Sequence, residues 1–396
     1  MVHCGAGGSR PSVAERVSHA WPLPLWMASF ALYLAGYPSV IRDGPHIESL
    51  KLKVYLRFYL NADLKVSYMD RRNVLKVLLS GLVLSITPTL PVPVLAQSAP
   101  DFGLPTLPQE RVHRIKMGGV EIIALHDGAT RLPLSDRYVV NAPFAEVKKL
   151  ASVQGLSTEY VELPFTAYLI VSGSRHILLD TGLGEFGSPR ETTGKLTESL
   201  RLAGYEPEDI DTILISHFHA DHISGLRNAA GNFVYPNATV WVPEPEYDYW
   251  MSDANRLAAP LQRKGAFEIA RRVFLGMPEK MLRKFSPGIE VAPGIFSKAA
   301  YGHTPGHTIY EVRSGKSSFY YIADMINVPA FFATHPEWMV ASDIDPERAL
   351  EVRRQFLSMV EKTNPLVGGF HFPFPGVGHL EPEGAGYKFY PENQSN

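Results

Sequence analysis

Four side chains able to bind a metal ion occur within six residues, directly after a strongly apolar segment. Residues 212–215 (Thr-Ile-Leu-Ile) have the composition of a buried strand, and His217, His219, Asp221 and His222 follow almost at once. Alternate side chains of an extended chain share a face, so the first two histidines can reach one ion. The other two residues come where the chain must turn and can reach a second ion. Imidazole and carboxylate suit zinc and similar divalent metals, and a chance polar loop is the weaker interpretation.

The composition restricts how such a metal could be held. The chain has one cysteine, Cys4, which excludes a disulfide framework, a cysteine-rich zinc module and an iron–sulfur cluster. Any metal must therefore be held by histidine and carboxylate. The formal net charge of −2 argues against a broad surface for nucleic acid or anionic lipid, so no nucleic-acid partner is expected.

Further candidate ligands occur later in the chain. His303 and His307 lie in one loop shaped by glycine and proline, Gly-His-Thr-Pro-Gly-His. Asp324 follows a short apolar strand, 319–323, where a carboxylate needs cationic partners. His371 follows a strand end made of small residues. Taken alone, each of these histidines is more often a turn or core residue than a ligand.

The N-terminal hundred residues have a different pattern. Residues 69–96 begin with Met-Asp-Arg-Arg, continue through a short apolar run and end in small residues, which predicts a secretory signal peptide of the twin-arginine type. The apolar run is shorter than the roughly 20 residues that span a bilayer, so no stable membrane insertion is expected after cleavage. The predicted location is the periplasm or the external medium. A buried helix is the alternative interpretation.

Residues 1–68 precede this signal and show no sustained period. We interpret them as translated upstream sequence or a disordered extension, with Met69 as the true start. A membrane anchor at 23–37 competes with this interpretation, but the stretch is short and contains Pro24. Residues 97–109 are predicted to be a linker and 110–396 a single folded domain.

From residue 110 onwards, strand and helix signals alternate. Residues 120–125 predict a strand that ends at the turn signal Asp127-Gly128, and 166–171 with 176–179 predict a hairpin. Helices are predicted over 195–203 and from Asp345-Pro346 to about residue 362. Strands followed by helices, twice over, predict an α/β fold with sheets sandwiched between helices.

The ordered motifs resemble those of the metallo-β-lactamase superfamily over roughly residues 110–390. They are Asp180-Thr-Gly182, His217-x-His219-x-Asp221-His222, Thr-Pro-Gly-His ending at His307, then Asp324 and His371. The resemblance implies an αββα sandwich with a two-metal site between its sheets. It implies one metal on His217, His219 and His307, a second on Asp221, His222 and His371, and Asp324 bridging both. It also implies that Asp180 and His303 support these ligands without binding metal, and that the ions are zinc, with manganese, cobalt or iron as alternatives.

Within the superfamily, β-lactam cleavage is disfavoured, because Asp324 stands where those members place a cysteine or lack a bridging aspartate. No flavin domain, nuclease insertion or glutathione-binding helical domain is evident. Residues 370–380 and 383–389 resemble the methyl parathion hydrolase group, whose members cleave aryl phosphotriesters and whose relatives hydrolyse lactones and aryl esters. That resemblance implies a substrate pocket formed by Phe186, Trp250 and Phe267, with ordinary aromatic packing as the alternative.

The expected function is that of a dinuclear metal-dependent hydrolase. A hydroxide bridging two metals would cleave esters, lactones or aryl phosphotriesters of apolar small molecules. Asp324 would act as the bridge, and Asp221 would also move the proton. An N-acyl-homoserine lactonase is the nearest alternative, followed by a phosphodiesterase or nuclease and by a non-catalytic metal-binding member. The resemblance also suggests a homodimer.

Overall fold

The computed structural model describes residues 101–185 and 191–392. All of them belong to one compact unit, Val94–Asn396. The predicted extension 1–68, the predicted signal peptide 69–96 and Phe186 lie outside the described residues. Within the described ranges, no helix has both the length and the apolar character needed to cross a membrane.

In this part of the chain the strands form two seven-stranded sheets. The first contains β1 Val112–Met117, β2 Val120–Pro133, β3 Tyr160–Ser172, β4 Arg175–Leu179, β5 Thr212–Leu214, β6 Thr239–Pro243 and β7 Leu282–Phe285, in that spatial order. The second contains β8 Glu290–Ala292, β9 Ile295–Ala299, β10 Thr308–Ser314, β11 Ser317–Ala323, β12 Leu366–Gly369, β13 Val377–Glu383 and β14 Gly386–Pro391. The pairing is antiparallel from β1 to β4 and parallel from β4 to β7. In the second sheet only β11 and β12 pair in parallel.

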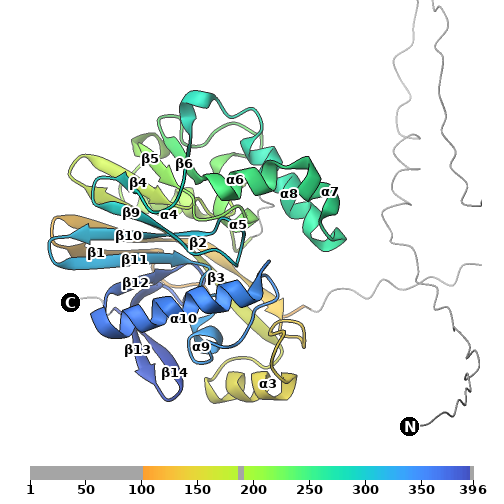
Figure 1. Ribbon diagram of the computed structural model, residues 1–396. Helices are drawn as coiled ribbons and strands as arrows, with labels where there is room; N and C mark the ends of the chain where they lie inside the picture. The colour runs from red at the N-terminus through yellow and green to blue at the C-terminus, as the bar shows by residue number, and fades with distance from the viewer. Residues whose placement is uncertain (1–100, 186–190, 393–396) are drawn as a thin grey trace, which may run out of the picture. The chain divides into compact units, whose positions relative to one another are not determined.

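Helices flank these sheets on both sides. They are α3 Phe144–Val153, α4 Leu196–Leu202, α5 Ala220–Ile223, α6 Glu244–Met251, α7 Asp253–Ala258, α8 Leu261–Phe274, α9 Pro329–Phe332 and α10 Pro346–Thr363. Helix α4 packs on β2 of the first sheet and α10 on β13 of the second. Figure 1 shows α10 lying across the second sheet, with α6, α7 and α8 grouped near β5 and β6. This layering confirms the predicted αββα sandwich.

Aromatic side chains join the two sheets. The ring of Tyr168 on β3 lies 5.3 Å from that of Tyr321 and 5.5 Å from that of Phe319, both on β11. The hydroxyl of Tyr310 on β10 donates a 2.6 Å hydrogen bond to the carbonyl oxygen of Ile215, just after β5. Buried aromatic rings contribute large apolar area, and buried hydroxyls need partners, so these contacts fix one sheet against the other.

Several predicted elements are confirmed, although β3 begins at Tyr160 rather than at residue 166. The hairpin forms from β3 and β4, and α4 is followed by Gly204 with a φ of 84°. Helix α10 begins after Asp345, whose side chain accepts a 3.2 Å hydrogen bond from the backbone N–H of Arg348. Such caps stabilise a helix by about 1 kcal/mol.

The turn predicted at Asp127-Gly128 is wrong. Strand β2 continues to Pro133, and its register with β3 shifts between His126 and Gly128. Gly128 has a φ of 141°, and a Cβ there would lie 2.1 Å from the carbonyl oxygen of Thr192. The glycine therefore marks a bulge under close backbone contact rather than a strand end.

Candidate metal centre

Six of the seven predicted ligands come together where several strands end at one edge of the sandwich. His217, His219, Asp221 and His222 follow β5, Asp324 follows β11 and His371 follows β12. Strands β11 and β12 are parallel neighbours, so the residues after them leave the sheet side by side. The β9–β10 loop brings His303 to the same place. The order of the strands thus unites ligands that are far apart in the sequence.

The first group consists of His217, His219, His303 and Asp324, whose ligand atoms all lie within 4.8 Å of one another. The Nδ1 atom of His219 is 3.0 Å from Nε2 of His217 and 3.0 Å from Nε2 of His303. The Oδ2 atom of Asp324 is 3.3 Å from the same nitrogen of His303. Nitrogens bound to one tetrahedral zinc at its usual bond length lie about 3.3 Å apart, so the spacing fits such an ion.

The structure brings His303 into the first group, whereas the family resemblance implied His307 as the ligand. The Nε2 atom of His303 faces the first group, whereas both nitrogens of His307 have backbone partners. Nδ1 of His307 donates to the carbonyl oxygen of Ala300 at 3.1 Å, and its Nε2 accepts from the backbone N–H of Asp324 at 3.3 Å. Burial lowers the pKa of His307 to about 3, so the ring is neutral and can accept that bond. His307 therefore contacts the backbone at Asp324, and His303 lies among the candidate ligands of the first group.

The second group consists of Asp221, His222 and His371, again with ligand atoms within 4.8 Å of one another. The Oδ2 atom of Asp221 lies 3.6 Å from Nε2 of His222 and 3.5 Å from Nε2 of His371. Asp324 faces this group too, with Oδ1 at 3.1 Å from His222 Nε2 and Oδ2 at 3.1 Å from His371 Nε2. Asp324 thus contacts both groups, as a bridging carboxylate would.

The donor atoms of this cluster fit a divalent cation. Among the described residues, Nε2 of His222 and Oδ1 of Asp324 are buried and have no hydrogen-bond partner. Leaving a buried polar atom unpaired costs about 1–3 kcal/mol, and a cation between them would remove that cost. Burial also holds the pKa values of His217 and His219 well below their usual range. Both imidazoles are therefore in the neutral form that binds metals.

Two buried carboxylates, Asp180 and Asp343, each bond to the histidine ring nitrogen that faces away from the cluster. Oδ2 of Asp180 accepts from Nδ1 of His222 at 2.7 Å and from the hydroxyl of Tyr321 at 2.5 Å. Oδ1 of Asp343 accepts from Nδ1 of His303 at 2.8 Å. A bond of this kind fixes the ring so that its other nitrogen faces the metal. Asp180 was predicted to have such a supporting position. Asp343 was missed, since no local motif marks it.

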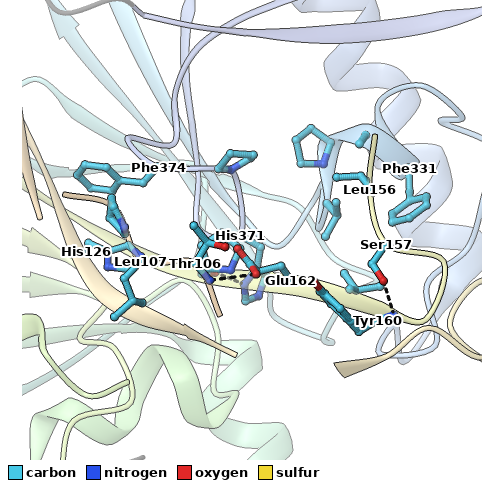
Figure 2. A pocket seen from close by; sticks show the side chains of 17 residues that line it. Thr106, Leu107, His126, Leu156, Ser157, Tyr160, Glu162, Phe331, His371 and Phe374 are labelled. Carbon is cyan, nitrogen blue, oxygen red and sulfur yellow. Dashed lines mark hydrogen bonds between the residues drawn. The ribbon is translucent and has the colours of Figure 1, made fainter. Parts of the chain in front are cut away.

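An apolar cavity of about 390 Å³ lies beside the cluster and has His371 in its wall (Figure 2). Three of its lining residues, Thr106, Leu107 and Pro108, come from the predicted linker. That linker packs on the domain, because Arg131 donates to the carbonyl oxygen of Phe102 at 2.7 Å. The other lining residues are His126, Leu156, Ser157, Tyr160, Val161, Glu162, Pro164, Val328, Pro329, Ala330, Phe331, Pro373 and Phe374.

Trp250 and Phe267, two of the aromatic residues predicted to form the pocket, do not line this cavity, and the third, Phe186, lies outside the described residues. Trp250 and Phe267 are 1% and 0% exposed, and their rings pack together at 4.6 Å between centroids. The Trp250 ring lies 6.1 Å from that of His219, so the pair packs against a candidate ligand histidine. Tyr160, Phe331 and Phe374 provide the aromatic surface of the cavity instead.

Comparison with known proteins agrees with the fold and the cluster. Residues 162–371 match the family model of the metallo-beta-lactamase superfamily, and the chain belongs to that superfamily. It is a metal-dependent hydrolase. The chain is 26% identical over 226 residues to an N-acyl homoserine lactonase of Bacillus thuringiensis, covering 52% of this chain and 80% of the relative.

Two solved structures are similar to most of the chain. One is AidC, a dizinc quorum-quenching lactonase in complex with a product, an N-acyl-L-homoserine. It is 27% identical with a TM-score of 0.66, and the match covers 72% of this chain and 98% of AidC. The other is the hydrolase AbOPH of the beta-lactamase superfamily, 26% identical with a TM-score of 0.68, covering 73% and 100% of the two chains.

Proposed function

We propose that this protein hydrolyses lactones that carry an apolar tail, with N-acyl homoserine lactones as the substrate class. The observation that carries the proposal is the shared position of His371, which belongs to the second metal-binding group and also lines the apolar cavity. A substrate whose ester lies at the cluster would therefore have its tail in the cavity. The similarity to two lactonases supports the same class.

The chemistry of the cavity suits an acyl chain. Leucine, valine, proline and phenylalanine side chains make up most of its wall. Its one carboxylate, Glu162, is already paired, because Oε2 accepts from the backbone N–H of Thr106 at 3.1 Å and from Nε of Arg131 at 3.0 Å. Each buried methylene contributes about 0.8 kcal/mol, so binding should strengthen as the acyl chain lengthens.

We assign two metal ions to the cluster. His217, His219 and His303 would hold one ion, and Asp221, His222 and His371 would hold the other, with Asp324 in contact with both. Zinc is proposed because histidine with carboxylate suits it and AidC is a dizinc enzyme. When bound, such ions activate water as a nucleophile and polarise the ester carbonyl.

The chain's own residues position the substrate and move protons. The Asp324 side chain is 4% exposed and is held by its neighbours, so it fixes the two groups relative to each other. The Asp221 side chain is 19% exposed, and its Oδ2 lies 3.5 Å from Nε2 of His371, the cluster residue that lines the cavity. Asp221 can therefore receive a proton and pass it to the departing alcohol oxygen when the ring opens.

Other ester substrates, export and dimer formation are further proposals. The same cluster could attack aryl esters or aryl phosphotriesters, as the resemblance to methyl parathion hydrolases implies. Export through the predicted signal peptide and assembly as a homodimer also stand as proposals, supported by the sequence pattern and the family resemblance.

The test uses the full chain loaded with zinc. We expect kcat/KM on N-dodecanoyl homoserine lactone to exceed that on a diethyl aryl phosphate at least 100-fold, and to exceed that on the N-butanoyl lactone about 10-fold. A preference for the phosphotriester would favour the broader alternative. Hydrolysis of neither substrate by a protein with two bound zinc ions would exclude the proposed substrate class.

A further inference from the structure

Glu246 is a buried carboxylate that joins two of the metal-binding loops. It lies in α6, is 0% exposed and accepts four hydrogen bonds. Oε1 accepts from the backbone N–H of Phe218 at 2.9 Å and from Nε1 of Trp250 at 2.6 Å. Oε2 accepts from the hydroxyl of Thr304 and the backbone N–H of Gly306, both at 2.8 Å.

The donors on these loops are sequence neighbours of the metal-binding histidines. Phe218 lies between His217 and His219, and Thr304 directly follows His303. A shift of the Glu246 carboxylate would therefore move the backbone on both sides of the first metal-binding group. The group draws its three histidines from these two loops, and the carboxylate bonds to both.

The loop around Gly306 rests directly on the start of α6. A Cβ at Gly306 would lie 2.2 Å from the backbone nitrogen of Glu246 and 2.6 Å from its Cα. Only glycine allows this approach. The Gly306 loop is therefore held at Glu246 in two ways, by close backbone packing and by hydrogen bonds to the Glu246 carboxylate.

Both carboxylate oxygens of Glu246 are occupied by hydrogen bonds within the protein. All four are N–H or O–H donors, and no ion pair of Glu246 with lysine or arginine is found in the described part of the chain. Burial raises the pKa of Glu246, whereas its four donors act to lower it. A carboxylate surrounded by donors on every side has no free oxygen for a reacting molecule.

We propose that Glu246 is a positioning residue, which sets the distance between the loop of His217 and His219 and the loop of His303. The inference rests on the metal assignment of the proposed function but not on its substrate. A carboxylate is required, because Oε1 accepts from Phe218 of one loop and from Trp250, while Oε2 accepts two bonds from the other loop. An amide of the same size accepts at only one end.

The test compares Glu246→Gln with the wild-type full chain. We expect the affinity for one zinc ion to fall about 10–100-fold in competition with a chromophoric chelator, while the second ion stays bound. We expect kcat to fall with KM nearly unchanged, since the cavity is untouched. The visible spectrum of the cobalt-loaded protein should change as well. Glu244→Gln, on the exposed side of the same helix, is the matched control and should behave as wild type.

A second variant addresses the case in which Glu246→Gln does not fold. Thr304→Val removes a single donor at Oε2 and should lower the affinity for the same ion by a smaller factor. Two zinc ions bound with unchanged affinity and an unchanged cobalt spectrum in both variants would overturn the inference. Weakened metal binding together with a wild type inactive on lactones would sustain the inference and reject only the substrate class. A wild type that binds no zinc would reject both.

Discussion

Oδ1 of Asp343 lies 2.8 Å from Nδ1 of His303, on the side of the ring opposite the metal-binding group. Behind Asp343 is the buried side chain of Arg353, with Nη2 3.6 Å from Oδ2 of Asp343. Arg353 is held in turn by the carbonyl oxygens of Met325 and Trp338, at 3.0 and 2.6 Å. A fixed carboxylate and a fixed cation thus set the orientation of one imidazole, and its Nε2 faces His219 as a result.

Replacing Asp343 should weaken metal binding without removing a ligand. Asp343→Asn keeps the side-chain size but replaces a charged acceptor, so we expect a 10–100-fold loss of zinc affinity and a parallel fall in kcat. Chelator competition measures the first quantity. Asp345→Asn is a close control, because Asp345 only caps α10 and should change stability by about 1 kcal/mol or less. Equal metal affinities in the two variants would contradict the role given to Asp343.

The two histidines of the β9–β10 loop should respond differently to truncation. We expect His303→Ala to lose one zinc equivalent and to reduce kcat/KM by about 1,000-fold, because a direct ligand is removed. His307→Ala should keep both ions and show mainly a lower melting temperature, since it loses contacts to Ala300 and Asp324. Metal content and thermal unfolding measure these effects. The opposite order would restore the assignment implied by the family resemblance.

Filling the cavity should change chain-length preference rather than chemistry. Leu156 lines the cavity and is 40% exposed, so Leu156→Trp can occupy space near its opening. We expect about a 10-fold loss in kcat/KM on the N-dodecanoyl lactone and little change on the N-butanoyl lactone. Val153→Trp is the matched control, because Val153 is 74% exposed and does not line the cavity. Equal losses on both lactones would place the acyl chain elsewhere.

His126 should make stability fall as the pH is lowered. Burial lowers the pKa of His126 to about 4, from 6.5 in the unfolded chain. The unfolded chain therefore binds a proton that the folded chain does not, and the contribution to stability is complete above 6.5 and is lost as pH falls towards 4. This amounts to roughly 2 kcal/mol between about pH 7 and pH 5. Urea unfolding with chelator present should show a smaller pH dependence in His126→Gln, and an equal dependence would refute the assignment.

The sequence predicts the cluster because its ligands follow strands at short range. His217, His219 and His222 are set by one strand end, and Asp324 and His371 by two others. The choice between His303 and His307 depends on Asp343, which is distant in sequence and contacts only one of them. A local pattern carries no information about such a contact.

Other features depend on packing in the same way. The glycine after Asp127 predicts a turn, but the approach of the Thr192 backbone makes it a bulge. Glu246 has no motif, because its role arises only when α6 lies against two loops. Trp250 and Phe267 pack against each other and are buried, which the sequence alone does not distinguish from a place in a pocket wall.

Residues 106–108, ahead of β1, offer a way to change the cavity without changing the candidate metal centre. Thr106, Leu107 and Pro108 form part of the cavity wall, and none of them is among the candidate metal ligands. A change in the length or sequence of that segment would remodel the space offered to the substrate and leave the ligand set intact. Part of the selectivity is thus encoded in a stretch of chain that carries no candidate ligand, and selection can alter that stretch while conserving the ligand set.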